Sequence, residues 1–385
     1  MSPWPTVPAH FWSLLAACLG ILLALWWMLL GSGRAARRRS LRTRIAALEQ
    51  GGGAAPLTPA QDAAIQQSLW QELPPPQARL PAVDMPRRNA LYARPWFLFV
   101  GDENANVGRL LTAAAGAQEE EAARHAAPAT RPFWRWHRLP AMTAIDVHAG
   151  VLRPASHPHE HSLWYRALLE LAERRKRLPL NGIVVCIAAA TLLEAARERD
   201  DLARRMRALV HETADQLRIQ LPVYLVVTGL ERLEGFGALR AALPVEVQGQ
   251  ALGHRLHNGA AARVPAGLQF DGLSAELMRR VHALRMALLR AGTSPAQRQA
   301  IHAFVEQLGA LQPGLRATAE LLFGNGAGPR SPRWRGLYFT AAPPDDGGSV
   351  FAHDLFARFL PADQPLAHSR RPGASSDSDF ASTRM

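Results

Sequence analysis

The sequence is poor in cysteine and in lysine. Its two cysteines lie far apart, Cys18 in an apolar run near the start and Cys186 in a predicted buried strand, so they are not placed to pair. This excludes a disulfide framework and a zinc site built from cysteines, and it fits a reducing cytoplasm for the domain that contains Cys186. Lys176 is the only lysine, so the formal net charge of +12 rests on arginine.

Charged side chains are also absent from residues 11–31, which are strongly apolar. As a helix that rises about 1.5 Å per residue, this run is long enough to cross a hydrocarbon core of about 30 Å. A cleaved signal peptide is the alternative, but it usually has a basic start and a shorter apolar run. Residues 1–6 contain no basic side chain. We therefore predict one retained transmembrane helix at residues 11–31.

Arginines follow this run closely, and none precedes it. Because positive charge stays on the cytoplasmic side of a membrane, residues 1–10 should be periplasmic and the large domain cytoplasmic. We prefer this explanation, together with attraction to anionic lipid head groups, to nucleic-acid binding. The arginines are Arg34, Arg37, Arg38, Arg39, Arg42 and Arg44.

A buried strand, a tight loop and a helix start follow one another at residues 95–116, which is the layout of a phosphate-binding loop. A working loop has the pattern G-x-x-x-x-G-K-[ST]. Counted from Gly101, the second glycine, the lysine and the hydroxyl residue are replaced by Asn106, Val107 and Gly108. Two carboxylates also follow Gly101, where a triphosphate would bring its own negative charge. The pattern indicates the scaffold of such a loop without its chemistry.

From residue 94 onward, short apolar strands alternate with amphipathic helices. This alternation is typical of a parallel sheet with helices on both faces, so we predict an α/β fold. The expected strands are 96–100, 142–147, 183–188, 223–228 and 336–340, and three helices at 274–290, 295–308 and 314–323 form a subdomain before the last strand.

Several strand-borne motifs occur in a familiar order. The segments are 95–101, 145–150 (similar to "IDTAG"), 179–185 (similar to "P-[IL]-N-G-[VI]"), 221–228 (similar to "FPVYVLxTK"), 233–236 (similar to "LxGF") and 335–340 (similar to "RGVYFTS"). Over about residues 94–360 the chain thus resembles the N-terminal cytoplasmic part of the IcmF/TssM family. That family is the large inner-membrane component of bacterial type VI secretion systems.

The resemblance implies a mostly parallel sheet of P-loop or GTPase-like type with a helical subdomain, preceded by one transmembrane helix. It divides the chain into an extracytoplasmic N-terminus at 1–10, a transmembrane helix at 11–31, a basic juxtamembrane segment and linker at 32–93, a GTPase-like domain at 94–272, the helical subdomain at 273–330, a last strand and closing helix at 331–366, and a disordered tail at 367–385. The family's further span and periplasmic region have no counterpart here, so we expect a shortened or accessory form.

The nucleotide-reading elements of the family are degenerate in this chain. The "TKxD" element that reads guanine is replaced by a segment with Gly229 for lysine and Glu231 for aspartate, and His148 replaces the threonine of "IDTAG". Together with the altered loop, these changes indicate a pseudo-nucleotidase. We therefore expect no catalytic residue and no bound cofactor.

The expected function is that of an inner-membrane scaffold or accessory component of a type VI secretion membrane complex. Its partners would be other membrane-complex proteins, such as a TssL-like protein, and the baseplate. The alternative is an NTP-binding or NTP-hydrolysing membrane-anchored protein with a non-standard phosphate loop, for which GTP or ATP with Mg²⁺ would be the cofactor. Its degenerate site would consist of Gly101, Asn104, Asn106, Gly108, Arg109 and Asp146. Arg109 would partly replace the missing lysine, and Asp146 would approach a metal.

Two further clusters have a chemical and a structural interpretation. Residues 157–161 contain three histidines and Glu160, which suit Zn²⁺ or Ni²⁺, but the spacing H-x-H-x-H with an embedded proline is not a known catalytic one. We predict a solvated loop and no metal, and a metal-responsive protein is the alternative. Trp134 and Trp136 alternate with arginines, as in proteins that bind single-stranded nucleic acid. We favour an edge strand and no nucleic-acid partner.

A run of four basic residues ends the helix predicted near residue 177. We expect it to stabilise the helix C-terminus through the helix dipole, without any partner. The run consists of Arg174, Arg175, Lys176 and Arg177.

Overall fold

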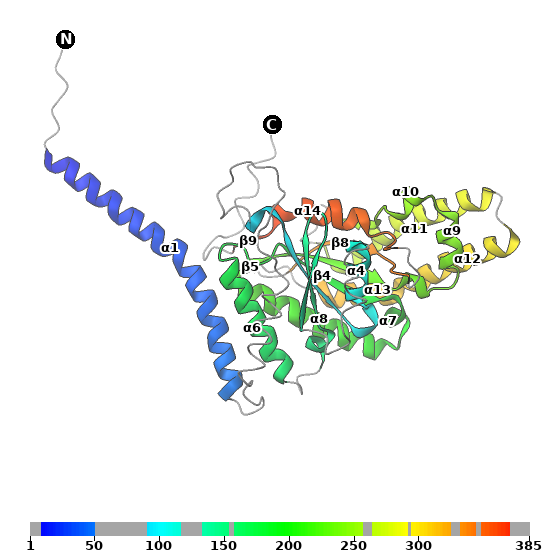
Figure 1. Cartoon of the computed structure of the whole chain (residues 1–385), viewed down its shortest axis with the longest axis horizontal. Helices are drawn as coiled ribbons and strands as arrows, with labels where there is room; N and C mark the ends of the chain where they lie inside the picture. Colours follow the sequence, from blue (N-terminus) through cyan, green and yellow to red (C-terminus); the bar gives the residue numbers. More distant parts are fainter. Residues whose placement is uncertain are drawn as a thin grey trace, which may run out of the picture.

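The computed structural model describes residues 9–50, 91–116, 133–153, 158–256, 264–291, 294–324, 332–343 and 348–369. Its centre is a seven-stranded sheet in the order β2-β3-β1-β4-β6-β8-β7. Figure 1 shows this sheet in the middle of the domain, with β4 and β8 labelled. All five predicted strands are confirmed, and the favoured edge strand at the tryptophans is confirmed as β2. The strands are β1 Trp96–Gly101, β2 Trp134–Arg138, β3 Thr143–Val147, β4 Gly182–Ala188, β6 Pro222–Thr228, β7 Leu252–Arg255 and β8 Arg333–Phe339.

The five inner strands run parallel, and the two edge strands β2 and β7 run antiparallel to them. The chain first extends the sheet from β1 to β3 on one side and then crosses over to β4 on the other. In open α/β sheets, the crevice outside the carboxyl ends of the strands at such a reversal is where ligands bind. The topology thus directs attention to the loops that follow β1, β3, β4, β6 and β8.

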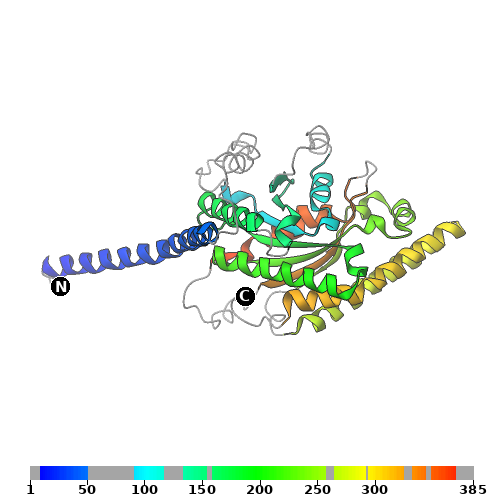
Figure 2. The same cartoon turned by 90° about the horizontal axis from the view of Figure 1, so that it is seen from below.

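Both faces of the sheet are buried, as the apolar strands predict. Along β1, Trp96, Leu98 and Val100 belong to one core cluster, and Phe97 and Phe99 belong to a second cluster. This split follows from the alternation of side chains across a strand. Figure 2 shows the sheet with helices on either side. The helices that follow the strands are α4 Val107–Ala115, α6 Pro158–Arg174, α7 Ala189–Leu193, α8 Ala196–Leu217, α9 Phe236–Ala242 and α10 Val245–Gln248.

The three helices of the predicted subdomain are present as α11 Ala266–Arg290, α12 Pro295–Ala310 and α13 Gln312–Phe323. The predicted start of the first helix at residue 274 is wrong, because Pro265 caps the helix and Phe270 is buried in its second turn. Phe270, Phe304 and Leu315 belong to the same core cluster as the sheet residues. The helices therefore extend the main core and do not form a separate one.

Helix α1, Ala9–Gln50, is longer than the sequence suggests and is docked on the domain. Leu41 is fully buried, Arg42 forms a 3.0 Å ion pair with Glu173 on α6, and the Ser40 hydroxyl donates a 3.0 Å hydrogen bond to Gln216 on α8. Residues 40–42, in the predicted juxtamembrane segment, thus pack on α6 and α8. Residues 51–90 of the predicted linker lie outside the described residues.

The first half of α1 projects away from the domain (Figures 1 and 2). Its apolar side chains between Trp12 and Leu23 are exposed, with Leu22 at 63%. In the portion of the chain that the structure describes, no helix meets the length and apolarity needed to cross a membrane. The predicted span at residues 11–31 therefore gains no support from the structure.

One residue of the basic run after α6, Arg175, is enclosed by the fold and contacts other side chains, whereas the sequence predicted no partner for the run. Arg175 is fully buried, and its guanidinium lies 4.8 Å from the ring centroid of Tyr92 and 4.5 Å from that of Trp96. Its Nη1 donates a 3.0 Å hydrogen bond to the Asn181 side chain, which also accepts from the Trp96 N–H. Burial lowers the Arg175 pKa to about 10. Arg175 thus joins the segment before β1 to the segment before β4.

The C-terminal segment closes the second face of the sheet with the π-helical turn Leu355–Phe359 (η5), α14 Leu360–Ala362 and the 3₁₀ turn Gln364–Leu366 (η6). Beyond them, β9 His368–Ser369 pairs antiparallel with β5 Ile219–Gln220. Residues 367–369, which the sequence assigned to a disordered tail, are thus part of the fold. Their backbone hydrogen bonds with β5 hold them in the fold, and such bonds leave no pattern of side chains in the sequence.

A buried carboxylate anchors this segment. Asp363, 1% exposed, accepts hydrogen bonds from the Arg335 guanidinium at 2.9 and 3.1 Å and from the Tyr224 hydroxyl at 2.6 Å. Arg255 also pairs with it. Burial and the neighbouring Arg255 lower the pKa of Arg335. Asp363, between α14 and η6, is therefore the shared counterion of Arg255 on β7 and Arg335 on β8.

We expect Asp363→Asn to lower the free energy of unfolding by about 3–5 kcal/mol, because it leaves buried arginine charge without its counterion. Urea denaturation followed by far-UV circular dichroism would measure the change. Asp354→Asn is the matched control, since Asp354 faces a largely exposed Arg358 at 3.7 Å and such pairs contribute under about 1 kcal/mol. Equal losses in the two variants would contradict the assigned role of Asp363.

Candidate functional site

The loop after β1 has the course of a phosphate-binding loop but a different interior. Gly101 is required by close packing, because a Cβ there would lie 2.7 Å from Val107 Cγ2 and 3.1 Å from Cys186 Cβ. Asn106, in the place of the second glycine, has φ 45° and ψ 49°, a left-handed conformation that asparagine adopts more readily than most residues. Val107, in the place of the lysine, is 6% exposed and belongs to the second core cluster.

The position of the hydroxyl residue is closed by a carboxylate. A Cβ on Gly108 would lie 2.8 Å from Oδ2 of Asp146 on β3. A serine or threonine at this position would thus meet Asp146 before it could reach a metal ion. Gly108 and Asp146, two residues of the predicted nucleotide site, therefore lie side by side, and their proximity is a packing contact between α4 and β3.

Asp102 turns inward at the foot of the loop. Its Oδ2 accepts a 2.8 Å hydrogen bond from the hydroxyl of Thr191 on α7. The Asn104 amide lies 3.5 Å from the same hydroxyl and 3.5 Å from Glu194 Oε1. The loop after β1 is therefore tied to the loop after β4 by its own side chains.

Burial raises the pKa of Asp102 above its ordinary value. The Thr191 hydroxyl and nearby backbone N–H groups, of Ala188, Asp102 and Ala105, oppose this rise without cancelling it. The donors at the foot of the loop thus serve an internal carboxylate, whereas in a phosphate-binding loop the backbone N–H groups face the ligand.

A shallow cavity of about 240 Å³ lies beside this loop, which we call the edge pocket. It opens at the carboxyl ends of β6 and β8, next to the start of α4. Its lining comprises Asn104, Ala105, Asn106, Arg109, Leu110, Thr228, Gly229, Glu231, Arg232, Thr340 and Ala342.

The acidic residue at the position of the guanine-reading aspartate is engaged within the chain. Glu231 Oε2 accepts a 3.1 Å hydrogen bond from the backbone N–H of Ala342, in the loop after β8. Gly229 has φ 79°, which allows the tight turn before the 3₁₀ turn Leu230–Arg232 (η3). Glu231 thus joins the loops after β6 and β8.

The structure divides the six predicted site residues into two groups. Asn104, Asn106 and Arg109 line the edge pocket, whereas Gly101, Gly108 and Asp146 do not. Sequence reasoning did not single out Thr191, Arg232 and Thr340. Arg232 and Thr340 come from loops after different strands, and only the position of a polar residue just after an apolar strand could have pointed to them.

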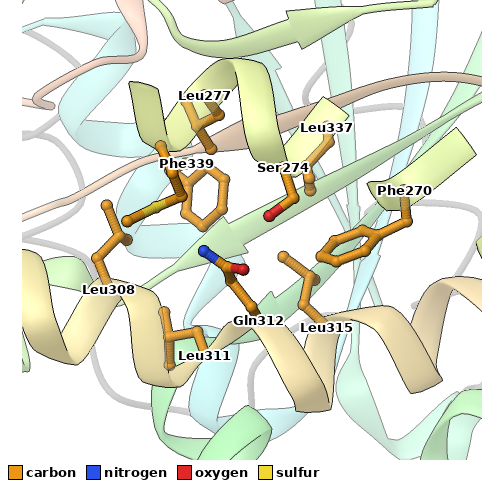
Figure 3. Close-up of a pocket in the computed structure, with 10 residues that line it drawn as sticks. Phe270, Ser274, Leu277, Leu308, Leu311, Gln312, Leu315, Leu337 and Phe339 are labelled. Atoms are coloured by element: carbon orange, nitrogen blue, oxygen red, sulfur yellow. The ribbon is translucent and has the colours of Figure 1, made fainter. Parts of the chain in front are cut away.

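A second cavity, of about 260 Å³, belongs to the core. It lies between α11, α13 and β8, where Ser274 and Gln312 are surrounded by apolar side chains (Figure 3). Leu337 and Phe339 of β8 face it, while Thr340 lines the edge pocket. This lining is that of a packed interior between helices and sheet, so we place no site there.

Most of the predicted histidine loop is part of a helix in the structure. Helix α6 begins at Pro158, so the loop predicted at 157–161 is wrong beyond residue 157, which itself lies outside the described residues. His148 instead caps the 3₁₀ turn Ala149–Leu152 (η2), accepting a 3.2 Å hydrogen bond from the Gly150 N–H. Within the described ranges, no group of three or more metal-ligating side chains is found.

The fold and this edge define an α/β protein with an open, mostly parallel sheet and loops gathered at its carboxyl end. A sequence profile of the IcmF-related N-terminal domain matches residues 157–347. The type VI secretion system component TssM1 of Pseudomonas aeruginosa (strain PAO1) is 28% identical over 264 residues, which cover 66% of this chain and 24% of the relative. The chain therefore belongs to the IcmF/TssM family, and it spans about a quarter of the length of that relative.

We expect the wild-type chain to gain unfolding free energy relative to Asp102→Asn as the pH falls from about 7.5 to about 4. Because the folded-state pKa of Asp102 is raised, ionisation costs the folded state, and that cost disappears once the carboxyl is protonated. Urea denaturation at several pH values would measure the difference. Thr191→Val removes a contact that lowers the pKa, so it should move the transition to higher pH. Parallel pH profiles for wild type and Asp102→Asn would contradict the burial of this charge.

Proposed function

We propose that this protein is a structural component of a type VI secretion membrane complex that acts by binding partners and hydrolyses no nucleotide. Membership of the IcmF/TssM family supports a place in the secretion system. The observation that carries the non-catalytic part is the burial of Val107 at the position of the phosphate-binding lysine. Phosphoryl transfer depends on positioning and on cations that neutralise the phosphates, so the loss of this lysine removes a central element.

Two other contacts support the same proposal. Asp146 fills the space beside Gly108, where a metal-binding hydroxyl would stand, and Glu231 is engaged by the Ala342 backbone. A bound nucleotide would bring its own negative charge next to both carboxylates. The partners we propose are other membrane-complex proteins of TssL type and the baseplate, and no nucleic acid.

We expect no saturable heat when GTP or ATP with Mg²⁺ is titrated into the 385-residue chain in detergent, up to about 1 mM nucleotide. Hydrolysis needs binding first, and the absence of the lysine together with the Asp146 and Glu231 carboxylates disfavours binding of a triphosphate. A far-UV spectrum typical of a folded α/β protein would confirm that the sample is competent.

One observation favours the alternative of an NTP-binding protein. Arg109 and Arg232 line the edge pocket together and could meet phosphate oxygens without a lysine. Saturable nucleotide binding that is lost in Arg109→Ala or Asp146→Ala would establish this alternative. Arg298→Ala, which changes an exposed arginine on α12, is the control for the loss of one positive charge.

We further propose that the first half of α1 attaches the protein to the inner membrane, with residues 1–10 periplasmic and the main domain cytoplasmic. The exposure of its apolar side chains and the family's place in the inner membrane support this. Arginines on the domain side of residues 11–31 agree with this orientation.

A variant with Leu15→Lys, Leu19→Lys and Leu22→Lys should move from the carbonate-resistant membrane fraction to the supernatant. Lysine near the centre of a membrane helix costs about 2.5–3.5 kcal/mol per residue. Leu268→Lys with Met286→Lys changes exposed apolar residues on α11, at 61% and 46% exposure, and should leave the distribution unchanged. Membrane retention of the triple variant would refute attachment through α1.

A further inference from the structure

A buried hydroxyl without a hydrogen-bond partner lies at the edge pocket. Thr228, the last residue of β6, is 2% exposed, and its Oγ1 has no partner among the described residues. Its neighbour Thr340 differs, because that hydroxyl donates a 3.3 Å hydrogen bond to the Val227 carbonyl. Several buried polar atoms of the described residues lack a partner, but Thr228 is the one whose residue also lines the edge pocket, so a ligand or solvent oxygen there would satisfy its hydroxyl.

Two guanidinium groups line the same pocket. Arg109, partly buried on α4, and Arg232, exposed after β6, make no side-chain hydrogen bond or ion pair within the described ranges. Nearby arginines behave otherwise: Arg153 pairs with Glu103 at 2.7 Å and Arg199 with Asp200 at 3.0 Å. The pocket therefore holds two positive charges that the rest of the fold leaves uncompensated.

The start of α4 adds to this positive field. Asn106, its N-cap residue, lines the pocket and makes no capping hydrogen bond with its side chain. The positive end of a helix dipole and the N–H groups of the first turn favour an anion there. The Asn104 and Asn106 amides, both in the lining, supply neutral donors.

Each nearby carboxylate has one oxygen engaged by a donor of the chain, and the second oxygen of Asp102 is buried without a partner among the described residues. Glu231 lines the pocket, but one of its oxygens accepts from the Ala342 N–H. Asp102 is bound by Thr191, toward β4. With two arginines against one glutamate, the lining keeps an excess of positive charge.

We propose that the edge pocket binds a compact, phosphate-sized oxyanion, held by the Arg109 and Arg232 guanidinium groups and by the Thr228 hydroxyl. Guanidinium groups bind such oxyanions through charge-assisted hydrogen bonds, and the hydroxyl gains the partner it lacks. The inference rests on the proposed function, because an edge that holds no nucleotide leaves the pocket open to a small anion. The pocket combines residues of the loop after β1 and the start of α4 with residues at the carboxyl ends of β6 and β8.

The test is calorimetric titration of inorganic phosphate into the 385-residue chain in detergent, with sodium acetate at matched ionic strength as the carboxylate comparison. We expect saturable phosphate binding in the millimolar range and weaker acetate binding. Arg109→Ala and Arg232→Ala should each weaken phosphate binding about tenfold, the effect of losing a charge-assisted hydrogen bond. Arg298→Ala should leave it unchanged.

Thr228 is tested separately by a pair of variants. Thr228→Val keeps the shape and removes the hydroxyl, so we expect it to weaken phosphate binding about fivefold, whereas Thr228→Ser should retain wild-type affinity. Unfolding temperatures of all variants without phosphate show whether any loss is a folding defect. Absent phosphate binding, or equal binding in the wild type and both arginine variants, would overturn the inference.

A parallel titration with GTP distinguishes a failure of this inference from a failure of the proposed function. Phosphate binding without nucleotide binding supports both. If neither ligand binds, the oxyanion site is refuted and the proposed function stands. GTP that displaces phosphate would refute the proposed function and would identify the nucleotide as the source of the bound phosphoryl group, with the oxyanion site itself upheld.

Discussion

The burial of the parallel strands on both faces is the constraint on which the other features depend. Strands such as β1, β4 and β6 have no exposed face, so polar side chains can gather only where the strands end. At the carboxyl edge these ends bring together the loops after β1, β4, β6 and β8. The same burial excludes water, so each carboxylate that enters the edge needs a donor from the chain itself. Thr191 and the Ala342 backbone N–H are those donors for Asp102 and Glu231.

Much of the fold could be predicted because apolar strands and amphipathic helices leave a clear period in the sequence. The strands that were missed lack that signal: β7, Leu-Gly-His-Arg, has no alternating apolar pattern and is only half-buried. The docking of α1 was missed for a related reason. Its buried face, with Leu41 beside several arginines, looks like a charged flank when only composition is considered.

The candidate site was predictable in part. Motif spacing located the loop at 101–108 and the absence of its lysine, since both are local properties of the sequence. It could not show that Asp146 closes the space beside Gly108 or that Thr228 has no partner, because these depend on atoms from different strands. Arg175 illustrates the same limit, because a basic helix end suggests solvent whereas the fold encloses it between Tyr92 and Trp96.

The docked helix α1 has a mechanical consequence. From Leu41, where it is held against α6 and α8, the helix continues to Trp12 without interruption, about 44 Å at about 1.5 Å per residue. A tilt of about 10° at the docking site would therefore displace the far end by about 8 Å. Helix α6, one of its two supports, begins next to Gly150, against which Glu160 packs closely, at the edge that carries the loop after β3. A small shift of α6 at this edge of the sheet would therefore tilt α1, and the length of α1 would convert that tilt into a displacement of several ångströms at Trp12.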